Sequence, residues 1–140
     1  MTHPTLAEWH ATAQTRDPKR LNALLADDAV FWSPVVHTPQ RGKAVTFQYL
    51  FAAFQVFFND GFRYVREVSS EEGAVLEFEV EIDGTAVNGV DMIRWNAAGK
   101  ITEFKVMLRP LKAVNLIHQK MAAMLEAGAR SHAHARRGSS

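Results

Sequence analysis

Asp91 is the residue of this sequence whose type and position best suit chemistry. It lies in an alternating segment, residues 85–95, where it shares one predicted face with Ile93 and other apolar side chains. A carboxylate in apolar surroundings nearly requires a partner, because an unpaired charge is costly to remove from water. The next alternating segment offers Lys105 and Arg109, and a hairpin through "NAAG" places Asp91 roughly opposite Lys105. We therefore predict that Asp91 contacts one of these two cations.

Two interpretations of an Asp91–Arg109 pair stay open. In the first, it is an ordinary ion pair that joins the sheet to the last helix. In the second, the pair lines a pocket, where Asp91 acts as a general base or activates water and Arg109 orients it or holds an anion. His37 is a third catalytic candidate, because the ordinary pKa of histidine lies close to neutral pH; its alternative is a solvated loop histidine.

Residues 9–58 carry more aromatic side chains than one face of a helix can bury. Most of them are expected to pack on a sheet or at a dimer interface. A subset is predicted to wall an apolar cavity for a flat or hydrophobic ligand. The candidate ligand-binding residues are Trp32, Tyr49, Phe54, Phe58 and Met107.

Missing motifs exclude several kinds of chemistry. The chain has 140 residues and no cysteine, which excludes disulfides, thiol catalysis and thiolate metal sites. Two histidines in "SHAHARR" lack the further fixed ligands that a specific site needs, so we predict no metal. There is no phosphate loop, dinucleotide fingerprint or serine elbow, and we predict chemistry without a cofactor.

Charge and hydropathy limit the partners. The formal net charge is +1, and both signs interleave along the part of the chain expected to fold, which predicts no nucleic-acid partner. No stretch approaches the roughly 18 apolar residues of a membrane span, and the first residues lack the pattern of a signal peptide. We therefore predict a soluble, cytoplasmic protein with no membrane partner.

The period of the apolar residues changes halfway along the chain. The first half predicts helices with one strand between them, and the second half predicts four antiparallel strands joined by hairpins, followed by a final helix. The predicted helices are 5–16, 18–26, 43–59 and 110–129, and the predicted strands are 29–34, 62–70, 73–82, 85–95 and 100–110. Residues 1–129 are expected to form a single domain, and residues 130–140 a disordered basic tail.

This order predicts an α+β fold with helices on one face of a strongly curved sheet. With the stretches "LADDAVFWSPV", "RGKA" and "DGTAVNGVDMIRWNAAGKITEFKVMLRPL", the chain resembles the nuclear transport factor 2-like superfamily, specifically its SnoaL-like branch, from about Leu6 to Leu125. The resemblance implies a cone-shaped antiparallel sheet that wraps around helices and encloses a pocket. It also implies a homodimer formed through the outer face of the sheet.

The resemblance leaves the function open, because members of this superfamily include polyketide cyclases, ketosteroid isomerases, epoxide hydrolases and non-catalytic binders. In the isomerases the base is an aspartate in the region that reads "FWSPVVHTP" here, where His37 is the only titratable residue. In the epoxide hydrolases an acid and an arginine on central strands work with a second acid, and only Asp91 and Arg109 match. We expect a small hydrophobic ligand, with cofactor-independent acid–base chemistry of the cyclase, isomerase or hydrolase type; the alternative is a non-catalytic ligand-binding or protein-association domain.

Overall fold

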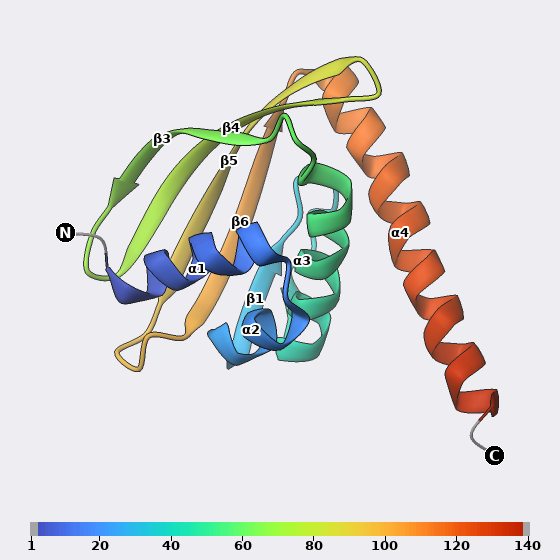
Figure 1. Cartoon of the computed structure of the whole chain (residues 1–140), viewed down its shortest axis with the longest axis horizontal. Helices are drawn as coiled ribbons and strands as arrows, with labels where there is room; N and C mark the ends of the chain where they lie inside the picture. The colour runs from blue at the N-terminus through green and yellow to red at the C-terminus, as the bar shows by residue number, and fades with distance from the viewer. Residues whose placement is uncertain (1–2, 139–140) are drawn as a thin grey trace.

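The computed structural model describes residues 3–138, and side chains are described for residues 3–128. The elements within this range are α1 (Pro4–Thr15), α2 (Pro18–Leu24), β1 (Leu25–Trp32), β2 (Gln40–Arg41), α3 (Lys43–Phe57), β3 (Arg63–Ser69), β4 (Gly73–Ile82), β5 (Thr85–Trp95), β6 (Ile101–Arg109) and α4 (Leu111–Gly138). The six strands form one sheet in the order β2-β1-β6-β5-β4-β3 (Figure 1). Strands β1 and β6 run parallel, and the other neighbouring pairs are antiparallel.

The helices lie mainly on one side of a curved, unclosed sheet (Figure 1). Helix α1 crosses the concave side, α3 packs against β1, and α4 leaves the end of β6 and contacts α3. This arrangement confirms the predicted α+β class, with a curved sheet wrapped around helices.

The first helices begin where the sequence provides caps. Asp17 accepts a hydrogen bond from the backbone nitrogen of Lys19 at 2.8 Å, and Pro18 occupies the first helical position, as predicted for α2. Helix α1 begins earlier than Thr5, because the Nδ1 atom of His3 accepts from the backbone nitrogen of Thr5 and Pro4 opens the helix. Local capping chemistry therefore accounts for both starts.

The hairpin between β5 and β6 corrects the predicted pairing of Asp91. The register shifts by one residue beside Trp95, so that Asp91 lies opposite Val106 and Arg109 lies opposite Asn88. Because side chains alternate along a strand, a one-residue slip moves a whole set of side chains to the other face. Lys105 and Arg109 consequently lie on the convex face of the sheet, and the predicted contact of Asp91 with one of them is wrong.

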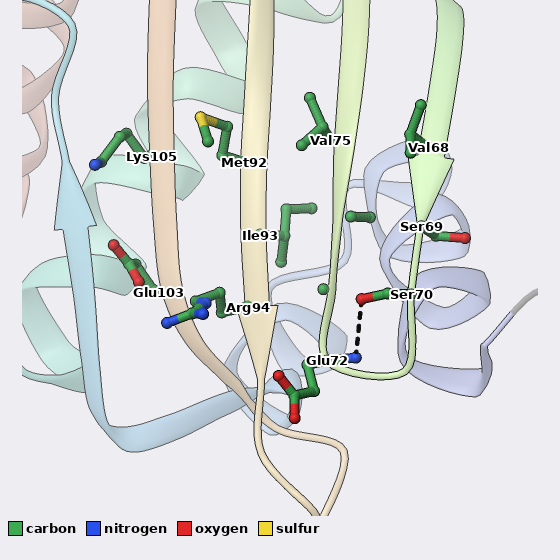
Figure 2. Close-up of a pocket in the computed structure, with 12 residues that line it drawn as sticks. Val68, Ser69, Ser70, Glu72, Val75, Met92, Ile93, Arg94, Glu103 and Lys105 are labelled. Carbon is green, nitrogen blue, oxygen red and sulfur yellow. Dashed lines mark hydrogen bonds between the residues drawn. The ribbon is translucent and has the colours of Figure 1, made fainter.

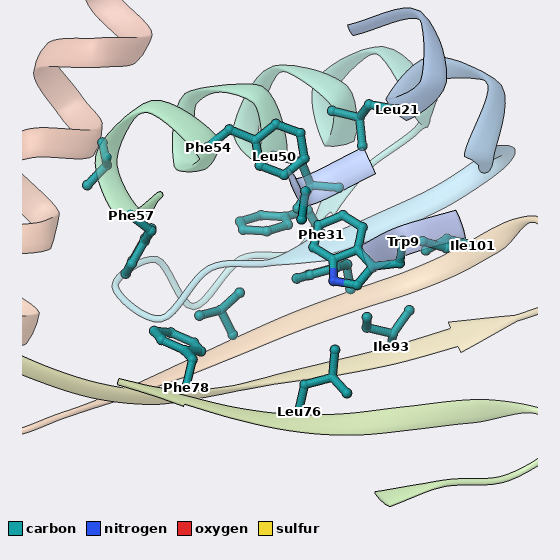
Figure 3. Close-up of a cluster of buried hydrophobic side chains, with 14 of the residues drawn as sticks. Trp9, Leu21, Phe31, Leu50, Phe54, Phe57, Leu76, Phe78, Ile93 and Ile101 are labelled. Carbon is teal, nitrogen blue, oxygen red and sulfur yellow. The ribbon is translucent and has the colours of Figure 1, made fainter. Parts of the chain in front are cut away.

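The core lies between the concave face and the helices (Figure 3). Strand β4 shows the predicted alternation, with Leu76, Phe78, Val80 and Ile82 buried on one face. Helices α1 and α3 contribute Trp9, Leu50, Phe54 and Phe57 to the same core. Most of the aromatic excess in the first half of the sequence is therefore used to fill the hollow of the sheet.

The end of the chain leaves two predictions without a test. Helix α4 buries Ala113, Ile117 and Met121 and is assigned as far as Gly138. The predicted disordered tail, residues 130–140, lies outside the residues whose side chains are described, and the single domain over residues 1–129 stays a prediction. None of the described helices has the length and apolar character that crossing a membrane requires.

Candidate functional site

Asp91 lies on the concave face of β5 and is only 7% exposed. Its Oδ2 atom accepts a hydrogen bond of 2.6 Å from the hydroxyl of Tyr64. Tyr64 reaches it diagonally from the edge strand β3, since Tyr64 pairs with Phe78 of β4 whereas Asp91 pairs with Leu76 of the same strand. The curvature of the sheet thus brings together two polar side chains whose strands are not adjacent.

A second hydrogen bond supports Tyr64 from the helical layer. The Nε1 atom of Trp9 on α1 donates to the hydroxyl oxygen of Tyr64 at 3.1 Å. The indole of Trp9 is itself held by ring contacts with Phe54 and Phe104, at centroid distances of 5.7 and 4.8 Å. Three elements therefore converge on the carboxyl group of Asp91, and its supporting partners come from outside its own hairpin.

Burial raises the pKa of Asp91 from 3.8 to about 7, because the ionised form loses its hydration, while the hydrogen bond from Tyr64 opposes this rise. Burial also raises the pKa of Tyr64 well above 10, and the neighbouring charge of Asp91 adds to the effect. The phenol consequently stays protonated and remains a donor at neutral pH. Asp91 is then a group that exchanges a proton near pH 7, where general acid–base catalysis is effective.

The space in front of Asp91 is small and apolar. A void of about 30 Å³ is lined by Asp91 together with Trp9, Leu50, Ala53, Phe54, Phe57, Phe58, Phe62, Phe78, Phe104 and Val106. This volume matches one water molecule, and Figure 3 shows the aromatic rings that fill the region. The second carboxyl oxygen, Oδ1, has no hydrogen-bond partner among the described residues.

A larger void of about 140 Å³, the outer void, lies beside the 30 Å³ void at Asp91, which we call the inner chamber. It is bounded by α3, α4 and the segment Ser33 to Val36 that follows β1, and His118 lies at its edge. Ala53, Phe57 and Val106 line both voids and form the wall between them. Together the voids are smaller than the roughly 300 Å³ at which ordinary ligand pockets begin, so a ligand larger than one small ring must move part of this wall.

The predicted ligand-binding residues separate into three groups. Phe54 and Phe58 line the inner chamber, and Tyr49 lines the outer void. Trp32 lies on the convex face instead, where the Nζ atom of Lys105 is 4.8 Å from the centroid of its ring. Met107, 49% exposed, is on that face as well. The register shift beside Trp95 explains why Met107 lies on the convex face, because the shift moves each side chain of β6 to the opposite face from the one predicted.

The two other predicted catalytic residues do not join Asp91. Arg109 is exposed on the convex face, and His37 is exposed in the segment between β1 and β2. Neither lines the inner chamber or the outer void. Within the part of the chain that the structure describes, no cluster of three or more histidine, aspartate or glutamate residues is suited to hold a metal ion.

Tyr64 and the hydrogen bond from Trp9 are the features of the candidate site that the sequence did not reveal. Strand β3 has mostly exposed residues, and Tyr64 is its one half-buried side chain. The signal available in the sequence was a lone aromatic in a strand with several charged residues, two positions after Phe62. Such a residue indicates contact with the core, but it does not indicate which polar group lies across the intervening strand.

A larger hollow lies away from Asp91, on the convex face (Figure 2). It is an open groove of about 500 Å³ that crosses β3 to β6 and includes Val68, Val75, Met92 and Lys105. Because Met92 follows Asp91 directly in β5, its side chain points to the opposite face. The groove is therefore separate from the buried carboxyl group, and its openness to solvent makes it a poorer acid–base site despite its size.

A curved, unclosed six-stranded sheet with four helices is the architecture of the nuclear transport factor 2-like class of folds. The sequence profile of the SnoaL-like domain matches residues 6–104, and the chain belongs to this family. No protein of curated function matches the chain.

Solved structures agree with this assignment. A steroid delta-isomerase from Pseudomonas aeruginosa is 35% identical, with a TM-score of 0.78 over 93% of this chain and 92% of that one. An uncharacterised protein with a cystatin-like fold from Silicibacter pomeroyi is 32% identical, with a TM-score of 0.84 over 92% of this chain and 90% of that one. A polyketide cyclase-like protein from Sinorhizobium meliloti, 14% identical with a TM-score of 0.61 over 76% of this chain and 95% of that one, shares the fold.

Proposed function

We propose that this protein binds a small hydrophobic molecule on the concave side of its sheet and that Asp91 transfers a proton to or from it without a cofactor. One observation carries the proposal: Asp91 is buried among aromatic rings, and its pKa of about 7 lies near neutral pH. A group that gains and loses a proton near the working pH is suited to serve as both base and acid in one reaction.

An isomerisation is the reaction that one such carboxyl group can complete alone. As a carboxylate, Asp91 accepts a proton from a carbon next to a carbonyl group, while the electron pair of the C–H bond moves toward the carbonyl oxygen. Protonated Asp91 then returns the proton to another carbon of the same molecule, and no other reactant is consumed. The 35% identity to a protein described as a steroid delta-isomerase supports this class over cyclisation or hydrolysis.

The ligand is expected to enter through the outer void, because this space opens between α3, α4 and the segment after β1. Reaching Asp91 requires displacement of Phe57 or Val106 from the wall that the two voids share. Phe54 and Phe58 then supply apolar contacts around the reacting group, and Tyr49 contacts the part that remains in the outer void. His37, Arg109, Trp32 and Met107 line neither void and have no role in this arrangement.

Binding without catalysis is the second candidate function, and the composition of the inner chamber favours it. Asp91 is the only titratable side chain among the residues that line this chamber, whereas many acid–base enzymes place two such groups around a substrate. A protein-association domain is the corresponding alternative without a ligand. Binding and turnover are therefore to be measured separately.

The first prediction concerns turnover by Asp91→Asn, tested with a panel of small cyclic unsaturated ketones and epoxides. We expect isomerisation of a ketone by the wild-type protein, with a rate that rises as the pH passes about 7, because the ionised form of Asp91 is the base. Asp91→Asn should lose at least about 100-fold in kcat, the usual contribution of a general base. Stopped assays with chromatographic separation of the isomers measure both quantities.

The matched control is Asp60→Asn, at an exposed aspartate outside both voids. It should retain wild-type turnover. If the ketones bind, as measured by calorimetry, but neither protein converts them, the binding function replaces the catalytic one. Turnover that is equal in the wild type and in Asp91→Asn would contradict the role of Asp91.

We also propose that the protein is a cytoplasmic homodimer that uses the convex face of its sheet. Apolar side chains on this face support the assembly, since Val68 is 63% exposed, Val75 is 38% exposed and Met107 is 49% exposed. The location stays a prediction from the sequence.

A further inference from the structure

The two hydrogen bonds behind Asp91 have a fixed direction. An indole nitrogen donates and does not accept, so the hydroxyl oxygen of Tyr64 must be the acceptor in its bond with Trp9. The phenolic hydrogen is then free for one bond, and the partner within reach is the Oδ2 atom of Asp91 at 2.6 Å. This distance is typical of a hydroxyl that donates to a charged oxygen.

We propose that Trp9 and Tyr64 are positioning residues that decide which oxygen of Asp91 carries its proton. Because Oδ2 is committed as the acceptor of Tyr64, protonation takes place at Oδ1. A proton on Oδ2 would have to point at Tyr64, whose own hydrogen would then turn away from Asp91. Among the described residues Tyr64 has no other acceptor, so that arrangement leaves a buried donor unsatisfied, which is costly.

The consequence lies on the cavity side of the carboxyl group and rests on the proposed function. Asp91 and Trp9 both line the inner chamber, and Tyr64 does not. Tyr64 therefore contacts Asp91 on the side away from the chamber. The free oxygen Oδ1 is therefore the atom that exchanges a proton with a ligand. It is a hydrogen-bond donor below the pKa of Asp91 and an acceptor above it, while Oδ2 remains bonded to Tyr64 in both states.

The other groups near this chain of bonds do not compete for the proton. Residues that face Asp91 from β4, β6 and α3 are apolar, including Leu76, Val106 and Phe54. On the outer side of Tyr64, His10 of α1 makes an edge-on ring contact at 5.4 Å and bonds through Nε2 to Glu67 at 2.5 Å. His10 and Glu67 are partly exposed and hydrogen-bond to each other. The hydroxyl of Tyr64 therefore bonds only to Trp9 and Asp91 among the described residues.

The test is a titration of Asp91 in the full chain without ligand, by ¹³C NMR of the labelled carboxyl carbon. Tyr64→Phe removes the donor to the carboxylate, and we expect the pKa of Asp91 to rise by about 1 to 2 pH units, which corresponds to a hydrogen bond to a charged group. Trp9→Phe retains the hydroxyl of Tyr64 but removes the N–H group that orients it. The pKa of Asp91 is then expected to rise by about 0.5 to 1 unit.

Infrared spectroscopy of the protonated carboxyl group separates positioning from packing. In the wild type, the C=O group is the one that accepts from Tyr64, which lowers its stretching frequency. In Trp9→Phe the frequency should rise, because the proton also occupies Oδ2 and the C=O group then faces the cavity. Since Trp9 is a core residue, a second variant carries benzothienylalanine at position 9, which preserves the ring shape and lacks the N–H group.

Two matched controls are present in the chain. Trp32→Phe removes an indole whose buried Nε1 has no hydrogen-bond partner among the described residues, and Tyr49→Phe removes a phenol on the wall of the outer void. Both should retain the wild-type pKa and carbonyl frequency of Asp91. Benzothienylalanine at position 9 with both values unchanged would overturn the proposal, as would Tyr64→Phe with an unchanged or lower pKa. Neither readout needs turnover, so this result is independent of whether the protein is an enzyme.

Discussion

At the scale of the residue, the candidate site centres on Asp91, a buried carboxyl group whose ionised form is disfavoured. Asp91 loses its hydration in an apolar chamber, and one hydrogen bond from Tyr64 compensates only in part. Carboxyl groups with strongly shifted pKa values cluster at functional sites, which makes Asp91 a candidate functional residue. The same shift must appear as a dependence of stability on pH.

The stability of the fold is expected to fall as the pH rises from about 4 to 7. The unfolded chain ionises Asp91 near 3.8 and the folded chain near 7, so the folded state binds this proton more tightly. The resulting stabilisation is fully present below pH 3.8, is lost as the pH rises toward 7, and amounts to about 4 kcal/mol. Asp91→Asn should therefore unfold with a free energy up to about 4 kcal/mol above that of the wild type at pH 8, and with a similar free energy at pH 4.

Urea denaturation between pH 4 and pH 8 measures this difference, and Asp60→Asn is the control for loss of an exposed charge. The control should follow the pH dependence of the wild type. A constant difference between Asp91→Asn and the wild type across the range would mean that the carboxyl group is not buried as described.

At the scale of the element, side chains of β4 and β6 occupy the space beside Gly89, which lies two residues before Asp91 on the same face of β5. A Cβ atom at position 89 would lie 2.5 Å from Cζ of Phe78 and 2.8 Å from the carbonyl oxygen of Met107. The glycine is thus required by packing against both neighbouring strands, and no unusual backbone angle is involved.

Gly89→Ala is expected to destabilise the fold by about 1–3 kcal/mol, because the added methyl group overpacks the centre of the sheet. Thermal unfolding measures the loss. Gly128→Ala is the matched control, since a Cβ atom there meets no atom within 4 Å and alanine favours the helix by up to about 1 kcal/mol. A neutral effect of Gly89→Ala would show that the side chains of Phe78 and Leu108 move aside at little cost.

At the scale of the whole molecule, the sheet divides the protein into two surfaces with different uses. The concave side holds the core and the two small voids, and the convex side is an open groove with apolar and charged residues (Figures 2 and 3). Val68, Val75 and Met92 form one row across that groove, because they pair in register on β3, β4 and β5. This row is the surface on which the proposed homodimer depends.

Light scattering after size-exclusion chromatography tests the dimer. We expect the wild type to elute with the mass of two chains, and Val68→Lys and Val75→Lys to elute as monomers, because a charge in each copy would be buried at the interface. Leu111→Lys, at a 74% exposed leucine outside the sheet, should remain dimeric. A wild type that is monomeric at all concentrations would exclude the assembly.

The sequence was sufficient for most of the elements because their signals are local, although it missed β2 and assigned Leu25 and Ala26 to a helix instead of to β1. Asp17 and Pro18 begin α2 through a cap, and the alternation of β4 separates its buried face from its glutamates. The same alternation placed Asp91 on the buried face of β5, next to Ile93. These features require only neighbours along the chain, and the structure confirms them.

The partner of Asp91 was decided by tertiary structure alone. A one-residue shift beside Trp95 turned Lys105 and Arg109 to the convex face, and the curvature of the sheet carried Tyr64 across β4 to the carboxyl group. Neither event has a local signature, because register and curvature arise from the packing of the strands against the helices. The sequence by itself determined that a carboxyl group is buried here; the folded sheet determined that a phenol, and not a cation, is bonded to it.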